Sequence, residues 1–351
     1  MLESKRESKL ESKLKSKRAN NKLGNVQTLL LAAAGLAAAG VSYAQPVKPD
    51  ATVGYPNKPV RWVVPFPAGA SNDVIARLIG GKLTEAWGHQ FVIDNRSGAG
   101  GLVGGETVAR AQPDGYTLLL ANPGPAITAP LLASRASYKP EDFLSVITIG
   151  YAPLILITHP SVPVRNGKEL ADYARANPKK VAWASSGIGS SLHIGLAVYL
   201  GATNAPVTHV PYKGTAPALT DLVGGQVQGM HTTTVSAEAV IKAQRVRVIA
   251  VASPKRSPLL PDVPTLAESG IKDAESLVWF GMTAPLKTAR PIIEKLNREV
   301  NRVLTLADVK ARLDQLGLEI QGGTPEDMDK FVRGETAKLK QLIKAGLLRP
   351  E

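Results

Sequence analysis

Short apolar runs alternate with longer amphipathic segments along most of the chain. Because the short runs are mostly continuous rather than alternating, they predict parallel strands that are covered on both faces. The predicted strands are Val60–Val64, Phe91–Asp94, Tyr116–Ala121, Ser145–Ile149, Leu154–Thr158, Val181–Ala184, Thr208–Val210, Val246–Ala252 and Val278–Thr283. The predicted helices are Asp73–Trp87, Gly104–Ala111, Gly167–Ala176, Ser191–Leu200, Ala216–Val223, Ser236–Ala243, Pro291–Leu306, Ala307–Leu316 and Pro325–Ala345. This alternation is typical of an α/β fold.

Two proline-rich stretches mark where the chain passes between domains. Leu144–Pro163 is apolar and then interrupted by prolines, and Ser253–Pro264 is rich in proline and charge. These stretches predict a discontinuous first domain, formed by 45–150 plus 261–351, and a second domain at 151–260. Two α/β domains joined by two crossings form a hinge around a cleft.

An apolar run followed by a Gly/Ser-rich loop and a helix start occurs twice. One copy passes through Phe66–Asp73 and the other through Ser185–Ser191. A helix start presents free backbone N–H groups and the positive end of the helix dipole, so such loops bind anions without a cationic side chain. The two loops therefore predict a binder of small anions. The candidate ligand-binding residues are Phe66, Ala68, Gly69, Ala70, Ser71, Asn72, Asp73, Asn122, Ser186, Gly187, Gly189, Ser190, Ser191, His193, Thr232 and Thr233.

Several candidates also have a purely structural interpretation. Asp73 is suited to capping the helix that it begins and, at the same time, to fixing the loop before it, and one of Ser190 and Ser191 is expected to cap the second helix. Ser71 and Asn72 could simply close a turn. His193 lies one turn into its helix, where packing is the alternative to ligand contact.

The N-terminal 44 residues have the layout of a secretory signal peptide. Met1–Lys22 carries eight Lys/Arg and three Asp/Glu, a net charge of 8 − 3 = +5. A short apolar run follows, and Ser42-Tyr43-Ala44 supplies small residues at the −3 and −1 positions of a cleavage site. The run is shorter than the ~20 apolar residues that span a bilayer. We expect cleavage after Ala44 and export to the periplasm.

Composition excludes several other classes of function. The chain after Ala44 has 351 − 44 = 307 residues and a net charge of 34 − 26 = +8, and its basic residues are scattered rather than gathered with aromatics. Nucleic-acid binding is therefore not expected. The absence of cysteine excludes disulfides and thiol chemistry.

Motifs for cofactors and for catalysis are missing as well. The five histidines show no local zinc motif, and the Gly98–Gly104 loop fails the GxGxxG spacing. No GxSxG elbow is present. We expect no metal, no cofactor and no enzymatic activity, with a secreted α/β hydrolase as the enzymatic alternative.

Several blocks, all in the same order, resemble the Bug family, the extracytoplasmic substrate-binding proteins of tripartite tricarboxylate transporters. The resemblance covers about Tyr55 to Glu351. It is carried by Pro65–Asp73, Asp94–Gly101, Val108–Leu119, Ser185–His193, Val210–Ala218, Asp262–Thr265, Trp279–Gly281 and Gly322–Glu326. The resemblance implies a two-domain periplasmic binding protein of type II. It also implies a small carboxylate ligand held by loop amides and ordered waters.

The chain departs from the family pattern at three places. Ala70 stands where a second glycine is usual, which implies strain if this position needs a positive φ. Asn72 stands where threonine is common. The Gln226–Thr234 segment lacks the aspartates often found there, which favours a ligand that carries carboxylates and no amine.

These observations predict a solute-binding protein that captures a mono-, di- or tricarboxylate. It is expected to be a monomer and to deliver its ligand to the membrane permease subunits of a tripartite carrier. The alternative is a periplasmic sensor whose closed form is presented to a membrane signalling partner.

Overall fold

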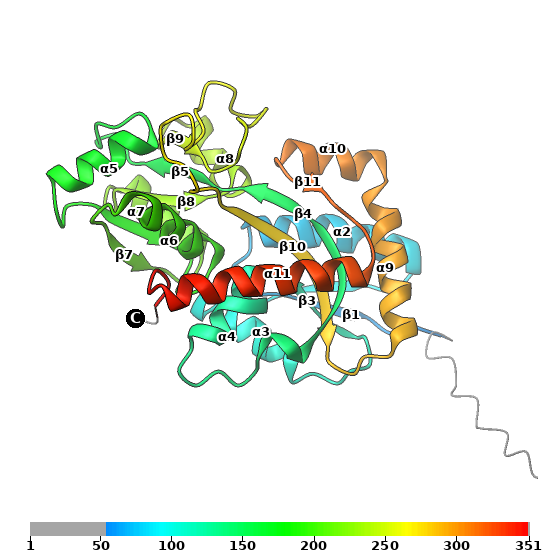
Figure 1. Ribbon diagram of the computed structural model, residues 1–351. Coiled ribbons are helices and arrows are strands. Elements are labelled where there is room, and N and C mark those ends of the chain that lie inside the picture. The colour runs from blue at the N-terminus through cyan, green and yellow to red at the C-terminus, as the bar shows by residue number, and fades with distance from the viewer. Residues whose placement is uncertain (1–53, 350–351) are drawn as a thin grey trace, which may run out of the picture. The chain divides into compact units, whose positions relative to one another are not determined.

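Two mixed β-sheets, each covered by helices, organise the chain (Figure 1). The computed structural model describes residues 54–349, so the predicted signal peptide lies outside the described residues. Sheet A has the strand order β11-β4-β10-β3-β1-β2, and sheet B has the order β7-β6-β8-β5-β9. Within 54–349, no helix has both the length and the apolar character needed to cross a bilayer.

The strands of sheet A are β1 (Val60–Val64), β2 (Phe91–Asn95), β3 (Thr117–Ala121), β4 (Phe143–Pro153), β10 (Leu277–Pro285) and β11 (Glu319–Ile320). Strand β1 is parallel to β2 and to β3, whereas β10 is antiparallel to β3 and to β4, and β11 is antiparallel to β4. The expectation of parallel strands is therefore wrong for half of this sheet. A continuous apolar run indicates that a strand is buried on both faces. An antiparallel strand inside a covered sheet is buried in the same way, so the run does not distinguish the two directions.

The strands of sheet B are β5 (Ile155–Thr158), β6 (Ala182–Ser185), β7 (Thr208–Pro211), β8 (Gly229–Thr232) and β9 (Arg247–Val251). Strand β6 is parallel to β7 and β8, and β5 is antiparallel to β8 and β9. The pattern of apolar residues does not predict β8, because His231 and Thr232 interrupt it. All of β8 is nevertheless buried, since it pairs on both sides within the sheet.

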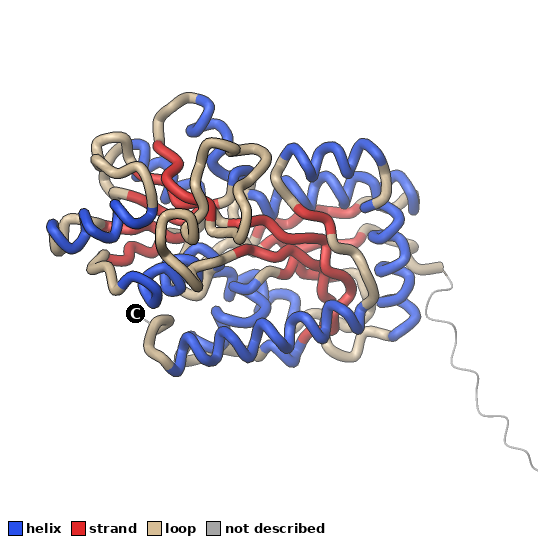
Figure 2. Tube along the Cα trace, turned by 45° about the horizontal axis from the view of Figure 1, so that its top comes forward, coloured by secondary structure: helices blue, strands red, loops and turns tan. Residues whose placement is uncertain are grey.

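Helices flank both sheets, as Figure 2 shows. They are α2 (Ser71–Trp87), α3 (Leu102–Ala109), α4 (Ala129–Leu132), α5 (Gly167–Ala176), α6 (Ser191–Thr203), α7 (Thr215–Val223), α8 (Thr234–Lys242), α9 (Arg290–Leu304), α10 (Ala307–Gln315) and α11 (Pro325–Lys344). Three short helical segments lie between these helices and the strands: η1 (Ala99–Gly101), η2 (Gly124–Thr128) and η3 (Pro140–Asp142). The sequence does not predict η2 and α4, because each contains a proline, at 125 and at 130. Both prolines lie in the first turn of their helix, where proline is tolerated.

The first helix of the described part begins two residues earlier than predicted. Ala70 precedes α2 with φ −76° and makes no side-chain cap, so the strain expected at Ala70 is absent. The helix ends as expected at Gly88, which adopts a left-handed φ of 67° and donates its N–H to Thr84 O at 2.9 Å.

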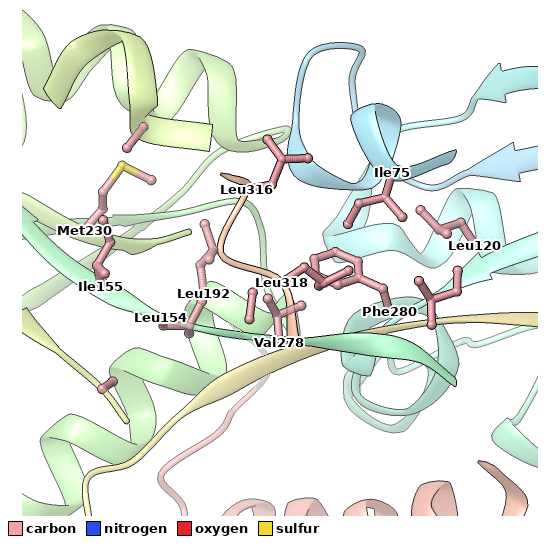
Figure 3. Packing of buried hydrophobic residues seen from close by; sticks show 14 of the residues in the cluster. Ile75, Leu120, Leu154, Ile155, Leu192, Met230, Val278, Phe280, Leu316 and Leu318 are labelled. Carbon is pink, nitrogen blue, oxygen red and sulfur yellow. The ribbon is translucent and has the colours of Figure 1, made fainter. Parts of the chain in front are cut away.

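Alternate residues of the central strands of sheet A face two separate hydrophobic clusters. Trp62 and Val64 of β1 belong to the cluster that contains residues of α2, α9 and α10, whereas Val63 belongs to the cluster with residues of α3 and α11. Helices therefore cover both faces of the sheet. The larger cluster continues into sheet B; in Figure 3, Ile75, Leu120 and Phe280 lie toward one end and Ile155 and Met230 toward the other.

Two strands carry the chain between the sheets, and they are hydrogen-bonded to each other where they cross. Leu154, between β4 and β5, donates its N–H to Ser276 O at 3.1 Å and accepts from Ala252 N at 2.8 Å. After β9 the chain stays beside sheet B as far as Leu266, whose N–H donates to Val251 O, and sheet A resumes at Leu277. The domain boundaries near 150 and 260 stay a prediction.

The C-terminal helix links the two sheets a third time. Helix α11 packs on β4, and the segment after it reaches α6 of sheet B (Figure 1). A Cβ added at Gly201 of α6 would lie 2.9 Å from Leu347, so the absence of a side chain there lets the tail approach α6 closely.

The core of sheet A is expected to carry much of the stability. Leu120→Ala removes a fully buried side chain from β3 and leaves a cavity, whereas Leu277→Ala changes a side chain that is 46% exposed. We expect Leu120→Ala to lower the free energy of unfolding by about 2–5 kcal/mol and Leu277→Ala by less than about 0.5 kcal/mol. Urea unfolding followed by circular dichroism measures both, and equal effects would contradict the assignment of this core.

Candidate functional site

A small cavity lies where the helix starts of the two sheets meet. Its empty volume is about 320 Å³ when the open mouth is included. The residues that line it are Phe66, Ser71, Asn72, Asn122, Ser186, Ser191, Leu192, Thr215, Thr233, Ser236 and Val278. None of these residues carries a charge.

Four helices begin at the cavity wall. Ser71 and Ser191 are the first residues of α2 and α6, Thr215 is the first residue of α7, and Thr233 is the N-cap of α8. The sequence predicts the first two helix starts as anion sites and does not predict the other two. The first N–H groups of a helix have no partner within the helix, and the helix dipole places partial positive charge at the same end.

Several of these N–H groups remain available to hydrogen-bond a ligand. Among residues 54–349, the backbone N–H groups of Asn72, Ser191 and Leu192 donate to no protein atom. A negatively charged group in the cavity would satisfy them, as anions do at other helix starts.

Ser236 of α8 reaches across from sheet B to the start of α2. Its Oγ accepts from Ser71 N at 3.3 Å and from Thr233 Oγ1 at 3.2 Å. A hydroxyl that accepts two hydrogen bonds still has its own hydrogen to donate, and Ser236 lines the cavity. This serine therefore joins the two walls and also faces the cavity. The sequence does not predict this contact, because nothing in the pattern around 236 reveals the approach of α2.

Asp73 is the third residue of α2 rather than its cap, so the prediction that it caps this helix is wrong. Its carboxylate accepts from Gly69 N and from Arg77 Nε, both at 3.0 Å. Burial alone would raise the pKa of this carboxyl, but the hydrogen bonds from Arg77 and Gly69 outweigh that effect and hold the pKa below its usual range. Asp73 thus stays charged and fixes the loop that precedes α2.

Phe66, Ser71 and Asn72 of this first loop reach the cavity. Ala68, Gly69 and Ala70 are not among the lining residues and form the turn behind them.

In the second loop, too, only some of the candidate residues reach the cavity. Ser186 and Ser191 line the cavity, whereas Gly187, Gly189, Ser190 and His193 lie behind them. Ser190 is the N-cap of α6, as the sequence predicts for one of these two serines, and accepts from His193 N at 3.3 Å. The Gly187 and Gly189 backbones adopt φ of 125° and 75°, which glycine allows without strain.

The remaining candidates come from the ends of β3 and β8. Asn122 and Thr233 line the cavity, whereas Thr232 is fully buried in β8. The lining residues missed in the sequence are Leu192, Thr215, Ser236 and Val278. Leu192 and Thr215 stand next to predicted elements and could have been found from the helix starts. Val278 gives no such signal, because it resembles any other strand residue.

Close contacts join the second loop to its neighbours beside the cavity. Thr128 Oγ1 of η2 donates to Gly189 O of the second loop. A Cβ added at Gly100 would lie 1.9 Å from Ile188 O, and one at Gly214 would lie 2.5 Å from the Pro67 ring. The predicted structural or cleft-edge role of the Gly98–Gly104 loop thus has a physical basis in this contact.

Two buried histidines lie behind the second loop. His193 stacks on His209 with ring centroids 4.2 Å apart and accepts from Gly189 N through Nδ1 at 3.1 Å. His231 accepts from Trp183 Nε1 through Nδ1 at 3.0 Å. Burial lowers the pKa of each to about 3, and the nearby His209 adds to the effect at His193. Both rings are therefore neutral near pH 7.

Among the described residues, no group of three His, Cys, Asp or Glu side chains is placed to hold a metal ion. The cavity offers backbone amides, hydroxyls, two carboxamides and a few apolar side chains. This set suits a small polar guest that accepts hydrogen bonds.

Comparison with known proteins identifies relatives over nearly the whole described part. Residues 75–348 match the model of the TctC family, described as the tripartite tricarboxylate transporter family receptor. The protein BugT of Bordetella pertussis is 34% identical over 319 residues, which cover 90% of this chain and 97% of BugT.

Solved structures of similar proteins share the fold. Rpa4515 of Rhodopseudomonas palustris, solved with adipate, is 36% identical with a TM-score of 0.81, covering 85% of this chain and all of that one. MatC of the same species, solved with bound malate, is 32% identical with a TM-score of 0.78, covering 82% of this chain and all of MatC. The predicted fold, a two-domain periplasmic binding protein, is confirmed.

Because His193 and His231 are neutral in the folded protein, we expect it to lose stability in mild acid. Because the folded pKa values lie near 3 and the unfolded value near 6.5, the unfolded chain takes up protons first as the pH falls. The stabilisation is complete above about pH 6.5 and declines toward pH 3, by at most about 1.4 kcal/mol per pH unit for each histidine. Asp73, whose pKa is lowered, loses its contribution only at lower pH.

Urea midpoints measured at pH 7.5 and pH 5.0 test this expectation. His231→Gln and His193→Gln should each reduce the difference between the two midpoints, because each removes one group that gains a proton on unfolding. A wild-type midpoint that does not change between these pH values would show that the histidines are not held neutral.

Proposed function

Since the chain belongs to the TctC family of tripartite tricarboxylate transporter receptors, we propose that it is a periplasmic solute-binding protein that captures a small carboxylate in this cavity. It then delivers the ligand to the membrane permease of a tripartite transporter. Family membership makes the chain a receptor and not an enzyme. Export by a signal peptide at 1–44, action as a monomer and closure of domain 45–150 plus 261–351 on domain 151–260 belong to the same proposal.

The observation that carries this proposal is a cavity without charge at which four helices start. Each helix start favours a nearby anion by about 0.3–1 kcal/mol when exposed and by up to about 2 kcal/mol when partly buried. Hydrogen bonds to a charged group contribute about 1.5–3 kcal/mol each. A carboxylate can collect several such contributions here without a lysine or an arginine.

The apolar part of the wall supports a ligand with a short carbon chain. Phe66, Leu192 and Val278 stand between the polar residues of the cavity. The adipate and malate of the two similar structures are both dicarboxylates with short chains, and we propose a ligand of this kind. Waters between the ligand and the hydroxyls would complete the hydrogen bonds at little cost.

The ligand residues that we propose are those of the candidate list that reach the cavity. They are Phe66, Ser71, Asn72, Asn122, Ser186, Ser191 and Thr233. The other candidates lie behind them, in the two loops, in the first turns of α2 and α6 and, for Thr232, in β8. The four missed lining residues, among them Ser236, join the proposed set.

Ser191→Asp tests the site. A carboxylate at the first position of α6 favours the helix itself, so the variant should fold, but it places negative charge where we expect the ligand. We expect wild-type protein to bind adipate or malate in titration calorimetry and Ser191→Asp to bind at least about tenfold more weakly, since like charges repel.

Ser134→Asp provides the matched control, because Ser134 is exposed and does not line the cavity. It makes the same change in charge and should leave the affinity unchanged. Wild-type protein, freed of ligand by unfolding and refolding, that gives no heat and no thermal shift with any small carboxylate would refute the proposed function. Equal weakening by both variants would refute the site.

A further inference from the structure

Two asparagines of the cavity wall form a chain of hydrogen bonds that begins at a backbone amide. Gly124 N donates to Asn122 Oδ1 at 3.0 Å, and Asn122 Nδ2 donates to Asn72 Oδ1 at 2.7 Å. Asn122 follows β3 and is 1% exposed, and Asn72 lies in the first turn of α2 and is 7% exposed. We call this chain the amide relay.

The direction of the amide relay is fixed by its first member. A backbone N–H can only donate, so Asn122 must turn its carbonyl oxygen toward Gly124 and its NH₂ toward Asn72. Asn72 must then accept through Oδ1. Its own NH₂ therefore faces away from Asn122, and within 54–349 no protein atom accepts from it.

The position of Gly124 is itself constrained. A Cβ at this residue would lie 2.5 Å from Gly100 O, so the turn from Asn122 into η2 is packed against the Gly98–Gly104 loop. The amide that begins the relay consequently has little freedom to turn away. Ala126 N also donates to Asn122 O at 3.1 Å, which holds the Asn122 backbone in the same turn.

Most other polar side chains of the cavity can act either as hydrogen-bond donors or as acceptors. Serine and threonine hydroxyls donate or accept according to the guest, and Ser71, Ser186, Ser191, Thr215, Thr233 and Ser236 are all of this kind. The Asn72 NH₂, in contrast, is a side-chain donor that cannot become an acceptor while the relay is intact.

We infer that Asn122 is a specificity-determining positioning residue, which sets Asn72 as a fixed donor so that the cavity favours a carboxylate there over a carboxamide and rejects an ammonium. A carboxylate has only acceptors, whereas a carboxamide presents its own NH₂ in one of its two orientations and an ammonium has only donors. This inference rests on the proposed function, because it concerns which chemical group the same cavity selects.

Asn122→Asp is the decisive variant. The new side chain has nearly the same shape, but it has no donor, so Asn72 must turn its NH₂ toward it and present Oδ1 to the cavity. We expect adipate to bind at least about tenfold more weakly, and the neutral diamide adipamide to bind more tightly than it does to wild-type protein. Malate and its diamide form a second pair of probes for the same titrations.

Ser191→Asp separates the reversal of the relay from the effect of charge. It adds the same charge to the other wall and does not touch either asparagine, so it should weaken adipate without strengthening adipamide. A rise in adipamide affinity in Asn122→Asp alone supports the inference. The same change in both variants, or no rise in either, overturns it.

Asn72→Leu covers the case in which a carboxylate at the buried position 122 prevents folding. This variant removes the donor without reversing it, so adipate should lose about 10–100-fold in affinity, the equivalent of one hydrogen bond to a charged group, and adipamide should change little. Equal losses for both probes would show that Asn72 only shapes the wall, which overturns the inference. Failure of wild-type protein to bind any small carboxylate would instead refute the proposed function.

Discussion

The backbone N–H groups at helix starts are the constraint on which the rest of the structure depends. Four helices begin at one cavity, and the first amides of each lack partners within the helix. Buried amides without partners are costly, so such a place stays stable only if a guest, water or a side chain supplies acceptors. Ser236 supplies one for Ser71 from the opposite wall. The other amides make the cavity suited to an anion.

Close packing of backbone against backbone brings these helix starts together. Gly100 lies against Ile188 O, Gly124 lies against Gly100 O, and Gly187 approaches Gly100 N. An added Cβ at these positions would lie 1.9–2.8 Å from those atoms, so a side chain there would force the backbone segments apart. The glycines of the loops therefore allow the two sets of amides to face one cavity.

The sequence predicts the parts of this arrangement that depend on local patterns. The loop before α2, the N-cap at Ser190 and the helix end at Gly88 follow from capping and turn preferences. The α/β alternation follows from the periods of the apolar residues. The strand β8 does not, because His231 and Thr232 look polar and are buried only through pairing within sheet B.

The parts of the site that can be predicted from the sequence are likewise those that depend on local patterns. Two of the four helix starts follow Gly/Ser-rich loops that mark them as anion sites in the sequence, whereas α7 follows a short bend and α8 follows β8 directly. Asp73 fixes the loop before α2 but does not cap the helix, because a local rule for caps cannot foresee that Gly69 and Arg77 both reach its carboxylate. The amide relay joins residues fifty positions apart along the chain, so no pattern of neighbouring residues contains it.

The absence of charge from the cavity wall has a physical advantage for a carrier. If a buried lysine or arginine held the carboxylate, release of the ligand would leave that cation buried without a partner, which costs several kcal/mol. Amides and hydroxyls can pass to water when the ligand leaves, at much lower cost. The charged pair of Asp73 and Arg77 lies behind the first loop, outside the cavity lining. Charge thus fixes the loop, neutral donors line the cavity, and departure of a carboxylate from such donors leaves no buried cation behind.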